Sequence, residues 1–123
     1  MMNILENQVW TGEEIYQMAV SAHRSGDLNT AATLYQLMLE KYPQHAEILS
    51  LFGELAFDAK NYKLAVELLR RAIAAAPEET IYYLSLARML TKIGDLNGAI
   101  IVYEECIARK LLIQTLSYGD TVK

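Results

Sequence analysis

Residues 46–79 read AEILSLFGELAFDAKNYKLAVELLRRAIAAAPEE, and this stretch decides the fold because its main features recur at one fixed interval. Pro77, near its end, lies 34 residues after Pro43. The same interval relates three residues that suit the start of a helix, namely Asp27, Asn61 and Asp95. Self-similarity at a period of about 20–50 residues is the sequence signature of repeat proteins. The chain is therefore predicted to be an array of similar units.

The interval divides the chain into three blocks with no insertion between them: residues 12–45, 46–79 and 80–113. Residues 1–11 form an N-terminal segment, and residues 114–123 form a C-terminal tail or cap. Within each block, apolar and small residues recur at helical spacing on both sides of the acid or amide, which predicts two antiparallel helices. We expect an all-α protein built from three helix-turn-helix hairpins.

Local signals mark where these helices begin and end. Thr11 and Glu14 have the spacing of a capping box, so the first helix is expected to begin after Thr11. Gly26 and Gly94 precede two of the caps and suit the left-handed conformation that closes a helix, whereas the middle block has Lys60 at that position. We expect Lys60 to adopt the same conformation at some cost, within a slightly different turn.

Small residues are expected at the centre of each hairpin, where its two helices cross. The first helices place there Ala19, Gly53 and Ala87, and the second helices place there Ala31, Ala65 and Ala99. Small side chains let helices approach closely, while larger residues fill the seam between hairpins.

These residues resemble the tetratricopeptide repeat (TPR) family, whose signature places an aromatic residue and Leu-Gly on the first helix, and Ala, an aromatic residue, Ala and Pro on the second. The middle block matches best, at Leu49, Phe52, Gly53, Ala65, Ala72 and Pro77. The third block departs from the pattern by ending in Leu111 where the proline would stand. The resemblance implies a right-handed α-solenoid of three antiparallel hairpins with a short C-terminal capping segment.

The end of the third block is more apolar than expected, because the terminal unit of a repeat array needs a polar outer face. The apolar residues at this end are Leu111, Leu112, Ile113 and Leu116, and no proline stops the helix there. Three alternatives stay open: residues 111–118 fold back as a capping helix, the surface meets another chain, or further repeats follow. Leu112 and Leu116 are accordingly predicted as a surface for self-association.

The composition is that of a soluble globular domain and excludes several classes of partner. Apolar residues make up 53% and charged residues 21%, with 15 acids against 11 bases for a net charge of −4. No cluster of Lys and Arg supports nucleic acid binding, and no segment approaches the roughly 18 apolar residues of a membrane span. The single cysteine, Cys106, allows no disulfide within the chain and fits a reducing, cytoplasmic location.

The residues that most often carry enzyme or metal chemistry do not converge in this sequence. His23 and His45 lie 22 residues apart, whereas a pair of metal ligands needs close helical or loop spacing. Cys106 takes the position of Met38 and Ala72 in the other blocks, which indicates a small buried hydrophobic residue rather than a nucleophile. We predict that the chain is not an enzyme and has no metal or cofactor.

Stacked hairpins form a superhelix whose concave wall is lined by the first helix of each hairpin, and this wall is the predicted binding site. Its positions mix aromatic, aliphatic and both signs of charge, which suits an amphipathic helix or an extended peptide. The predicted groove residues are Tyr16, Val20, Arg24, Ser50, Glu54, Phe57, Asp58, Leu84, Arg88 and Lys92. Tyr16 and Phe57 are the expected anchors, because aromatic side chains dominate many binding interfaces.

The groove differs from the best-known pocket of the family that it resembles. That pocket clamps the C-terminal carboxylate of chaperones with two Lys, two Asn and one Arg. The matching positions here are Tyr16, Val20, Leu51, Ile81 and Ser85. None of them carries the clamp residue, so a ligand of that kind is not expected.

Two functions stay open. In the first, the chain is a protein–protein interaction module, an adaptor or scaffold that binds a peptide or helix in its concave groove. The second starts from the stretch that runs from Tyr42-Pro43 through Asn61-Tyr62 to Ala72-Ile73. This stretch resembles repeats at the front of bacterial glycosyltransferase and sulfotransferase proteins. The chain would then be a substrate-recognition segment of a larger or truncated TPR-containing transferase.

Overall fold

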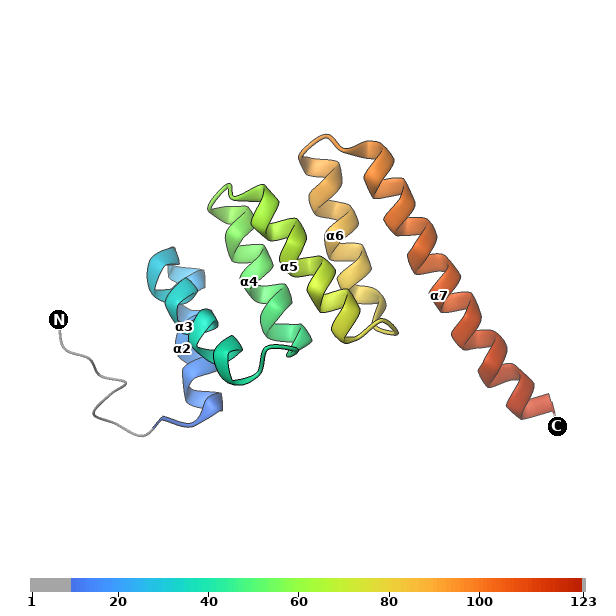
Figure 1. The fold of residues 1–123 in the computed structure, drawn as a ribbon, viewed down its shortest axis with the longest axis horizontal. Coiled ribbons are helices and arrows are strands. Elements are labelled where there is room, and N and C mark those ends of the chain that lie inside the picture. The colour runs from blue at the N-terminus through green and yellow to red at the C-terminus, as the bar shows by residue number, and fades with distance from the viewer. Residues whose placement is uncertain (1–9, 123) are drawn as a thin grey trace. The chain divides into compact units, whose positions relative to one another are not determined.

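The computed structural model describes residues 10–122, with side chains described for residues 10–111. Figure 1 shows the helices in chain order: α2 (Gly12–Ser25), α3 (Leu28–Lys41), α4 (Ala46–Asp58), α5 (Tyr62–Ala75), α6 (Thr80–Lys92) and α7 (Leu96–Val122). No strand occurs among the described residues, so the predicted all-α class is confirmed. The chain divides into two compact units, Met1–Pro43 with α2 and α3, and Gln44–Lys123 with α4 to α7.

The second helices of the three hairpins begin in the same way, with an acid or amide as N-cap. The side-chain oxygens of these caps accept a hydrogen bond from the backbone N–H three positions later. The donor–acceptor distances are 3.3, 3.4 and 2.9 Å for Asp27, Asn61 and Asp95 respectively. Each bond satisfies one of the N–H groups that a first helical turn leaves without a partner. The helix starts predicted from the 34-residue interval are therefore confirmed.

The turns inside the hairpins are also alike, including the one that lacks glycine. Gly26, Lys60 and Gly94 have positive φ angles of 88°, 66° and 92°. In every turn the N–H of the following cap residue donates to the carbonyl five positions earlier, at 2.8–2.9 Å. Lys60 thus has the predicted left-handed conformation, but the expected difference in its turn is wrong. That conformation costs a residue with a Cβ about 1–2 kcal/mol, which the hydrogen bonds of the turn help to offset.

The first helices, in contrast, begin with different caps. Thr11 and Glu14 form the predicted capping box, in which each side chain accepts from the other's backbone N–H at 3.0 and 2.9 Å. At the start of α4, Nδ1 of His45 accepts a hydrogen bond from the Ile48 N–H at 3.3 Å. Glu79, one interval later at the start of α6, makes no such bond. The sequence indicated only a loop position for His45, so its capping role is new.

The helices of the middle hairpin approach closely because Gly53 has no side chain. A Cβ at Gly53 would overlap Cδ2 of Leu69 and would lie 3.3 Å from the carbonyl oxygen of Ala65. Ala65 and Leu69 are both fully buried, so neither can move aside into solvent. Ala19 and Ala87, one interval before and after Gly53, are also buried. Small residues therefore lie at the centre of each hairpin, as predicted.

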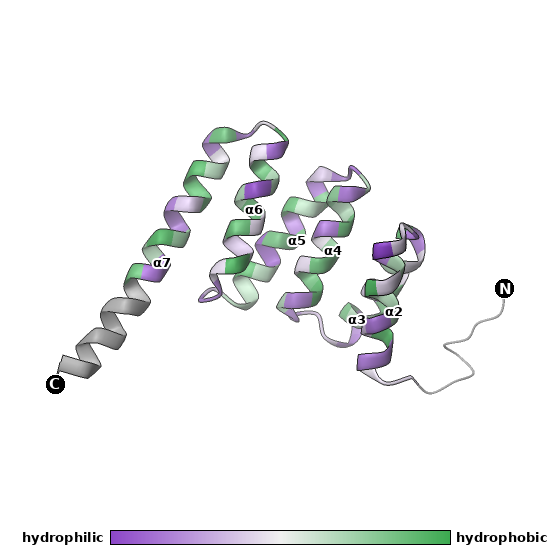
Figure 2. Cartoon of the chain, turned by 180° about the vertical axis from the view of Figure 1, so that it is seen from behind, coloured by the Kyte–Doolittle hydropathy of each residue, from purple (hydrophilic) through white to green (hydrophobic). Residues whose placement is uncertain are grey.

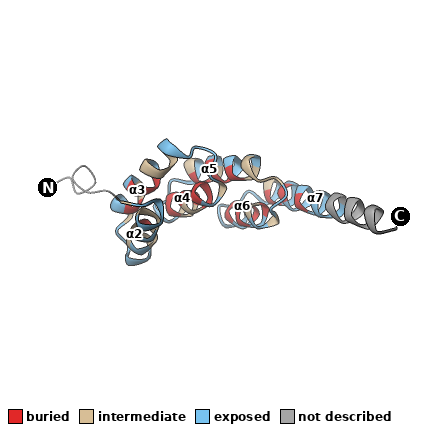
Figure 3. Ribbon diagram, turned by 90° about the horizontal axis from the view of Figure 1, so that it is seen from below, coloured by how far each residue is buried: buried red, intermediate tan, exposed pale blue. Residues whose placement is uncertain are grey.

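The third hairpin is held at the start of α6 by two side chains. The hydroxyl of Tyr83 donates a hydrogen bond to the Pro77 carbonyl at 2.8 Å. Cys106 of α7 is buried, and its Sγ lies 4.0 Å from the Thr80 carbonyl oxygen, which suits a weak S–H donor. Figure 3 shows buried residues on the sides of the helices that face one another. The interpretation of Cys106 as a small buried residue agrees with this position.

The last helix is much longer than its counterparts. α7 runs without a break for 27 residues, whereas α3 and α5 have 14 each. Figure 1 shows that α7, which runs antiparallel to α6, extends well past the start of α6. Residues 111–122 thus continue α7 and form no separate capping helix, which removes one of the three alternatives for this end. Leu112 and Leu116 belong to α7, but their side chains lie outside the described residues.

Candidate functional site

The first helices of the second unit, α4 and α6, each carry one row of residues on the side away from their own hairpin. Gly53 and Ala87 are buried in the crossings with α5 and α7. Residues one and five positions after them share another face of the helix, because positions four apart are neighbours on a helix surface. This face carries Glu54 and Asp58 on α4, and Arg88 and Lys92 on α6.

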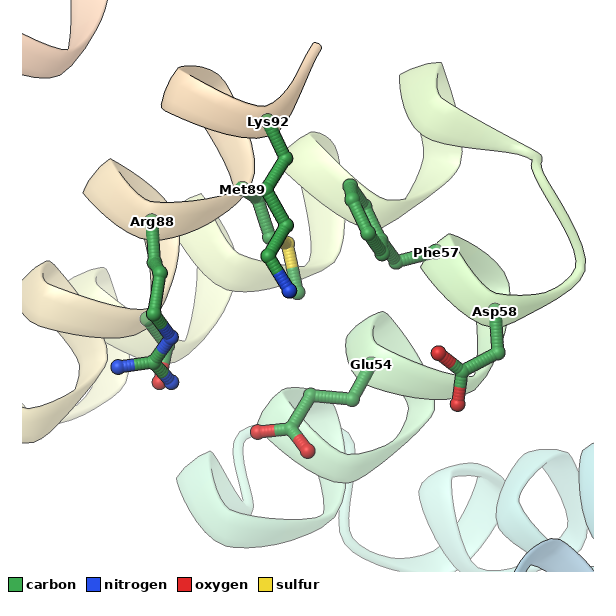
Figure 4. Close-up of a pocket in the computed structure, with 7 residues that line it drawn as sticks. Glu54, Phe57, Asp58, Arg88, Met89 and Lys92 are labelled. Atoms are coloured by element: carbon green, nitrogen blue, oxygen red, sulfur yellow. The ribbon is translucent and has the colours of Figure 1, made fainter.

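These two rows line a depression of about 140 Å³ between α4 and α6. Its lining residues are Glu54, Phe57, Asp58, Ser85, Arg88, Met89 and Lys92. Figure 4 shows the carboxylates of Glu54 and Asp58 on the α4 side and the cationic groups of Arg88 and Lys92 on the α6 side. The volume is below the roughly 300–1,000 Å³ of small-molecule pockets. A depression of this size accommodates one side chain of a larger ligand.

Phe57 is held in place by contacts with two side chains. Nζ of Lys92 lies 5.9 Å from the centroid of the Phe57 ring, within the cation–π range of about 6 Å. Tyr62 of α5 also packs against Phe57, with ring centroids 5.1 Å apart and an interplanar angle of 56°. Phe57 is half-buried, and its remaining surface lines the depression. A fixed aromatic ring with free surface is well suited to anchor a ligand.

The charges around the ring are divided between the two helices. Within the described part of the chain, Glu54 and Arg88 form no salt bridge, so both can pair with a ligand.

Near the start of the same two helices, burial raises the pKa of Tyr82 above its ordinary value, and the carboxylates of Glu47 and Glu79 add to the shift. The Tyr82 hydroxyl therefore stays protonated at neutral pH and remains a hydrogen-bond donor.

The structure brings together half of the predicted groove residues. Those that line the depression are Glu54, Phe57, Asp58, Arg88 and Lys92. Ser50 is buried, and Leu84 is 42% exposed outside the depression. Tyr16, Val20 and Arg24 lie four residues apart on α2 in the first unit, which places them on one face of that helix. The part that these three residues play in a groove stays a prediction.

Two lining residues were left out of the predicted groove: Met89, which the sequence analysis missed, and Ser85, which it named only as a position matching the family's carboxylate clamp. Both are buried, and each directly follows a predicted groove residue, Leu84 or Arg88. Their spacing of four residues, which places them beside Arg88 and Lys92, was the available signal. It was not decisive, because a single sequence does not show whether such an edge position packs against a neighbouring helix or lines a surface.

The described residues contain none of the usual groupings for metal or membrane binding. No three His, Cys, Asp or Glu side chains among them are grouped closely enough to hold a metal ion. None of the helices that the structure describes combines the length and the apolar composition that a bilayer span needs.

Comparison with protein families identifies the repeat. A tetratricopeptide repeat family matches residues 22–93, which is more than half of the chain, and a second tetratricopeptide repeat family matches residues 81–110. The chain belongs to the tetratricopeptide repeat family. This confirms the resemblance inferred from the 34-residue interval. No curated protein matches this TPR chain.

Several solved structures are similar to the TPR chain. A mutant O-GlcNAc transferase from Thermobaculum terrenum is 31% identical, with a TM-score of 0.69 over 80% of this chain and 19% of the transferase. MamA from Desulfovibrio magneticus RS-1, from residue 41 to its end, is 26% identical, with a TM-score of 0.68 over 80% of this chain and 56% of that one. The TPR2B domain of yeast Sti1 in its pHsp70 complex is 15% identical, with a TM-score of 0.73 over 90% and 89%.

The comparisons differ in what they say about this chain. The Sti1 domain shares the fold alone, given its low identity. The TPR chain spans about a fifth of the transferase and just over half of the MamA fragment. What is shown for the chain is the repeat class and the fold, an all-α TPR array.

Proposed function

We propose that this TPR array binds a peptide or helix of a protein partner along its first helices, and that the depression between α4 and α6 receives one side chain of that ligand. The observation that carries the proposal is the gathering of Glu54, Phe57 and Asp58 from α4 with Arg88 and Lys92 from α6. Ser50 and Leu84 are proposed to extend the binding surface on α4 and α6, and Tyr16, Val20 and Arg24 are proposed to form a binding surface of their own on α2.

The chemistry of the depression indicates what the ligand carries. Phe57 and Met89 offer apolar surface to one hydrophobic side chain. A basic ligand residue would pair with Glu54 on α4, and an acidic one with Arg88 on α6. Exposed ion pairs contribute only about 0–1 kcal/mol each, whereas an aromatic anchor can contribute about 2 kcal/mol or more. Affinity should therefore depend on Phe57, and ligand orientation on the charges.

Selection from a random peptide display library tests this proposal. Peptides selected by the wild-type chain are synthesised, and their affinity is measured by calorimetry against Phe57→Ala and Lys92→Glu. We expect Phe57→Ala to lose about 2 kcal/mol, or roughly 30-fold in affinity. We expect Lys92→Glu to remove the preference of the peptide for an acidic residue at one position, because it cancels the net positive charge of the α6 wall.

The control is Arg70→Glu, a charge reversal at an exposed position of α5 outside the depression. It should bind the selected peptides as the wild type does. Circular dichroism establishes that each variant is folded. Retention of the same peptides at full affinity by folded Phe57→Ala and Lys92→Glu would contradict the proposed site.

The alternative, a substrate-recognition segment of a transferase, is supported by the 31% identity to the Thermobaculum terrenum O-GlcNAc transferase. In that case the ligand would be the polypeptide that the transferase modifies. The test is to read the genomic frame around the coding sequence. A transferase domain in the same frame or in an adjacent gene would support this role, and its absence from both would count against it.

A further inference from the structure

The described part of α7 carries a row of exposed apolar residues away from the groove. We call this row the α7 stripe; it consists of Leu96, Ile100, Tyr103, Ile107 and Leu111, whose exposed fractions are 41–58%. Figure 2 shows apolar residues recurring along α7, and Figure 3 shows how exposed its described part is. Residues spaced three and four apart share one helix face. An exposed apolar surface of this kind commonly marks an interface.

The 34-residue register shows which surface the α7 stripe corresponds to. Of the equivalent residues on α5, Tyr62 at the start of the helix is 38% exposed, whereas Val66, Leu69 and Ile73 are not exposed. These three are covered because α6 packs against α5. The α7 stripe is thus the counterpart of a surface that a neighbouring helix covers in the preceding hairpin. Another helix is therefore the kind of partner that fits it.

The N-terminal helix of a second copy is a poor candidate for that partner. In α6, which follows another hairpin, Ser85 and Met89 are buried. The equivalent residues of α2 are Gln17 and Ser21, and both are polar and exposed. Packing this face on the α7 stripe would bury polar groups without partners, which is unfavourable. Head-to-tail stacking of copies is therefore disfavoured.

The α7 stripe is instead complementary to itself. Leu96 and Leu111 lie at equal distances from the midpoint between Tyr103 and Glu104, and so do Ile100 and Ile107. If two copies of α7 pack antiparallel about a twofold axis at that midpoint, each leucine meets a leucine and each isoleucine meets an isoleucine. We propose that a second copy of this chain binds here, with α7 packed antiparallel on α7 through the stripe to form a closed dimer.

Glu104 gives this arrangement a distinctive electrostatic property. Glu104 is exposed and lies next to the α7 stripe, one helical turn after Ile100. Across a twofold axis, each flank of an antiparallel helix pair meets the same flank of the partner, so Glu104 lies near the partner's Glu104. The two carboxylates carry the same charge and therefore repel each other. Glu104 should thus weaken the dimer, and this effect should require Glu104 in both copies.

The proposed dimer is separate from the proposed groove. The α7 stripe lies on α7, whereas the depression is lined by residues of α4 and α6. Binding of selected peptides and dimerisation can therefore be measured independently, and either can fail without the other.

Sedimentation velocity over a hundredfold range of concentration tests the dimer. The wild-type chain should pass from monomer to dimer and should form no larger species. Ile100→Ser and Ile107→Ser should each weaken dimerisation at least tenfold, because each buries a polar group twice in the symmetric interface. Ile81→Ser is the matched control, because Ile81 is 60% exposed on α6 outside the stripe, and it should dimerise as the wild type does.

Mixing wild-type chain with Glu104→Lys tests the symmetry. A contact between the two Glu104 flanks predicts that the mixed dimer forms in preference to both homodimers, because only the mixed dimer pairs opposite charges. A wild-type chain that stays monomeric, or that grows into larger assemblies, would overturn the proposal. So would folded Ile100→Ser and Ile107→Ser variants that dimerise normally, or a mixture in which the mixed dimer shows no preference.

Discussion

The α4–α5 hairpin and the α6–α7 hairpin share one register but differ in what lies beside their second helix. Leu69 of α5 is fully buried, whereas Tyr103, one interval later on α7, is 41% exposed. α6 packs against α5, and within the described residues α6 is the only helix with an extensive contact to α7. The difference teaches that local sequence determines each hairpin, while its neighbours decide which of its residues become core.

The largest effect should come from truncating the two residues just compared. Leu69→Ala should lower the free energy of unfolding by about 2–5 kcal/mol, because it removes buried contacts and leaves a cavity beside Gly53. Tyr103→Ala should cost about 1 kcal/mol or less, because much of that side chain is already in water. Urea unfolding of both variants measures the difference. Equal losses would mean that the neighbour of the second helix does not matter.

A smaller difference in stability is expected between substitutions at the helix crossings of α4 and α6. Gly53→Ala should destabilise the chain by about 1–3 kcal/mol, because the new methyl group would overlap buried Leu69. Ala87→Gly should cost about 1 kcal/mol through helix propensity. Gly12→Ala is the control, because nothing lies within 4 Å of a Cβ at Gly12. A Gly53→Ala variant that gains stability, as Gly12→Ala should, would show that Leu69 moves aside freely.

The fold was predictable because the repeat code is local. The side chains of Asp27, Asn61 and Asp95 cap their helices by accepting a hydrogen bond from the backbone N–H three positions later. Such bonds depend on neighbouring residues only. The turn at Lys60 was predicted less well. Its hydrogen bonds follow from the geometry of the helix end, so a lysine with positive φ forms the same turn as glycine.

The site was predictable only in part, because it depends on neighbours. Glu54 and Arg88 follow from the helical face, but Ser85 and Met89 are both buried and at the edge of the depression. Whether such a residue belongs to the core or lines the depression depends on how α6 packs against its neighbours. That packing cannot be inferred from a single sequence. His45 was missed as a cap because histidine is uncommon there, and only its Nδ1 contact reveals the role.

The turns of the two hairpins should differ in stability by about 1 kcal/mol. Gly94→Ala should destabilise the third hairpin by about this amount, because alanine is strained at a φ of 92°. Lys60→Gly should stabilise the middle hairpin by up to about 0.5–1 kcal/mol, because glycine removes the same strain. Thermal unfolding of both variants tests this. A stabilising Gly94→Ala would contradict the strain argument.

The smallest difference should lie at the starts of α4 and α6. His45→Ala should cost about 0.5–1 kcal/mol, because it removes the bond to the Ile48 N–H. His45→Asn is the control and should restore that stability. Glu79→Asn should gain a similar amount, because Glu79 makes no capping bond. Hydrogen exchange at the first turns of both helices detects these changes, and equal exchange in His45→Ala and wild type would argue against the cap.

Cys106 gives the third hairpin a reporter of its own motion. It is the only cysteine of the chain, and it is buried with its Sγ 4.0 Å from the Thr80 carbonyl oxygen. Because only 8% of Cys106 is exposed, a thiol reagent reaches its sulfur much faster when α6 and α7 separate. The labelling rate of the unmodified protein therefore measures how often the hairpin opens. A ligand or second copy that stabilises the closed hairpin would slow that chemistry, so its binding could be followed without adding any label.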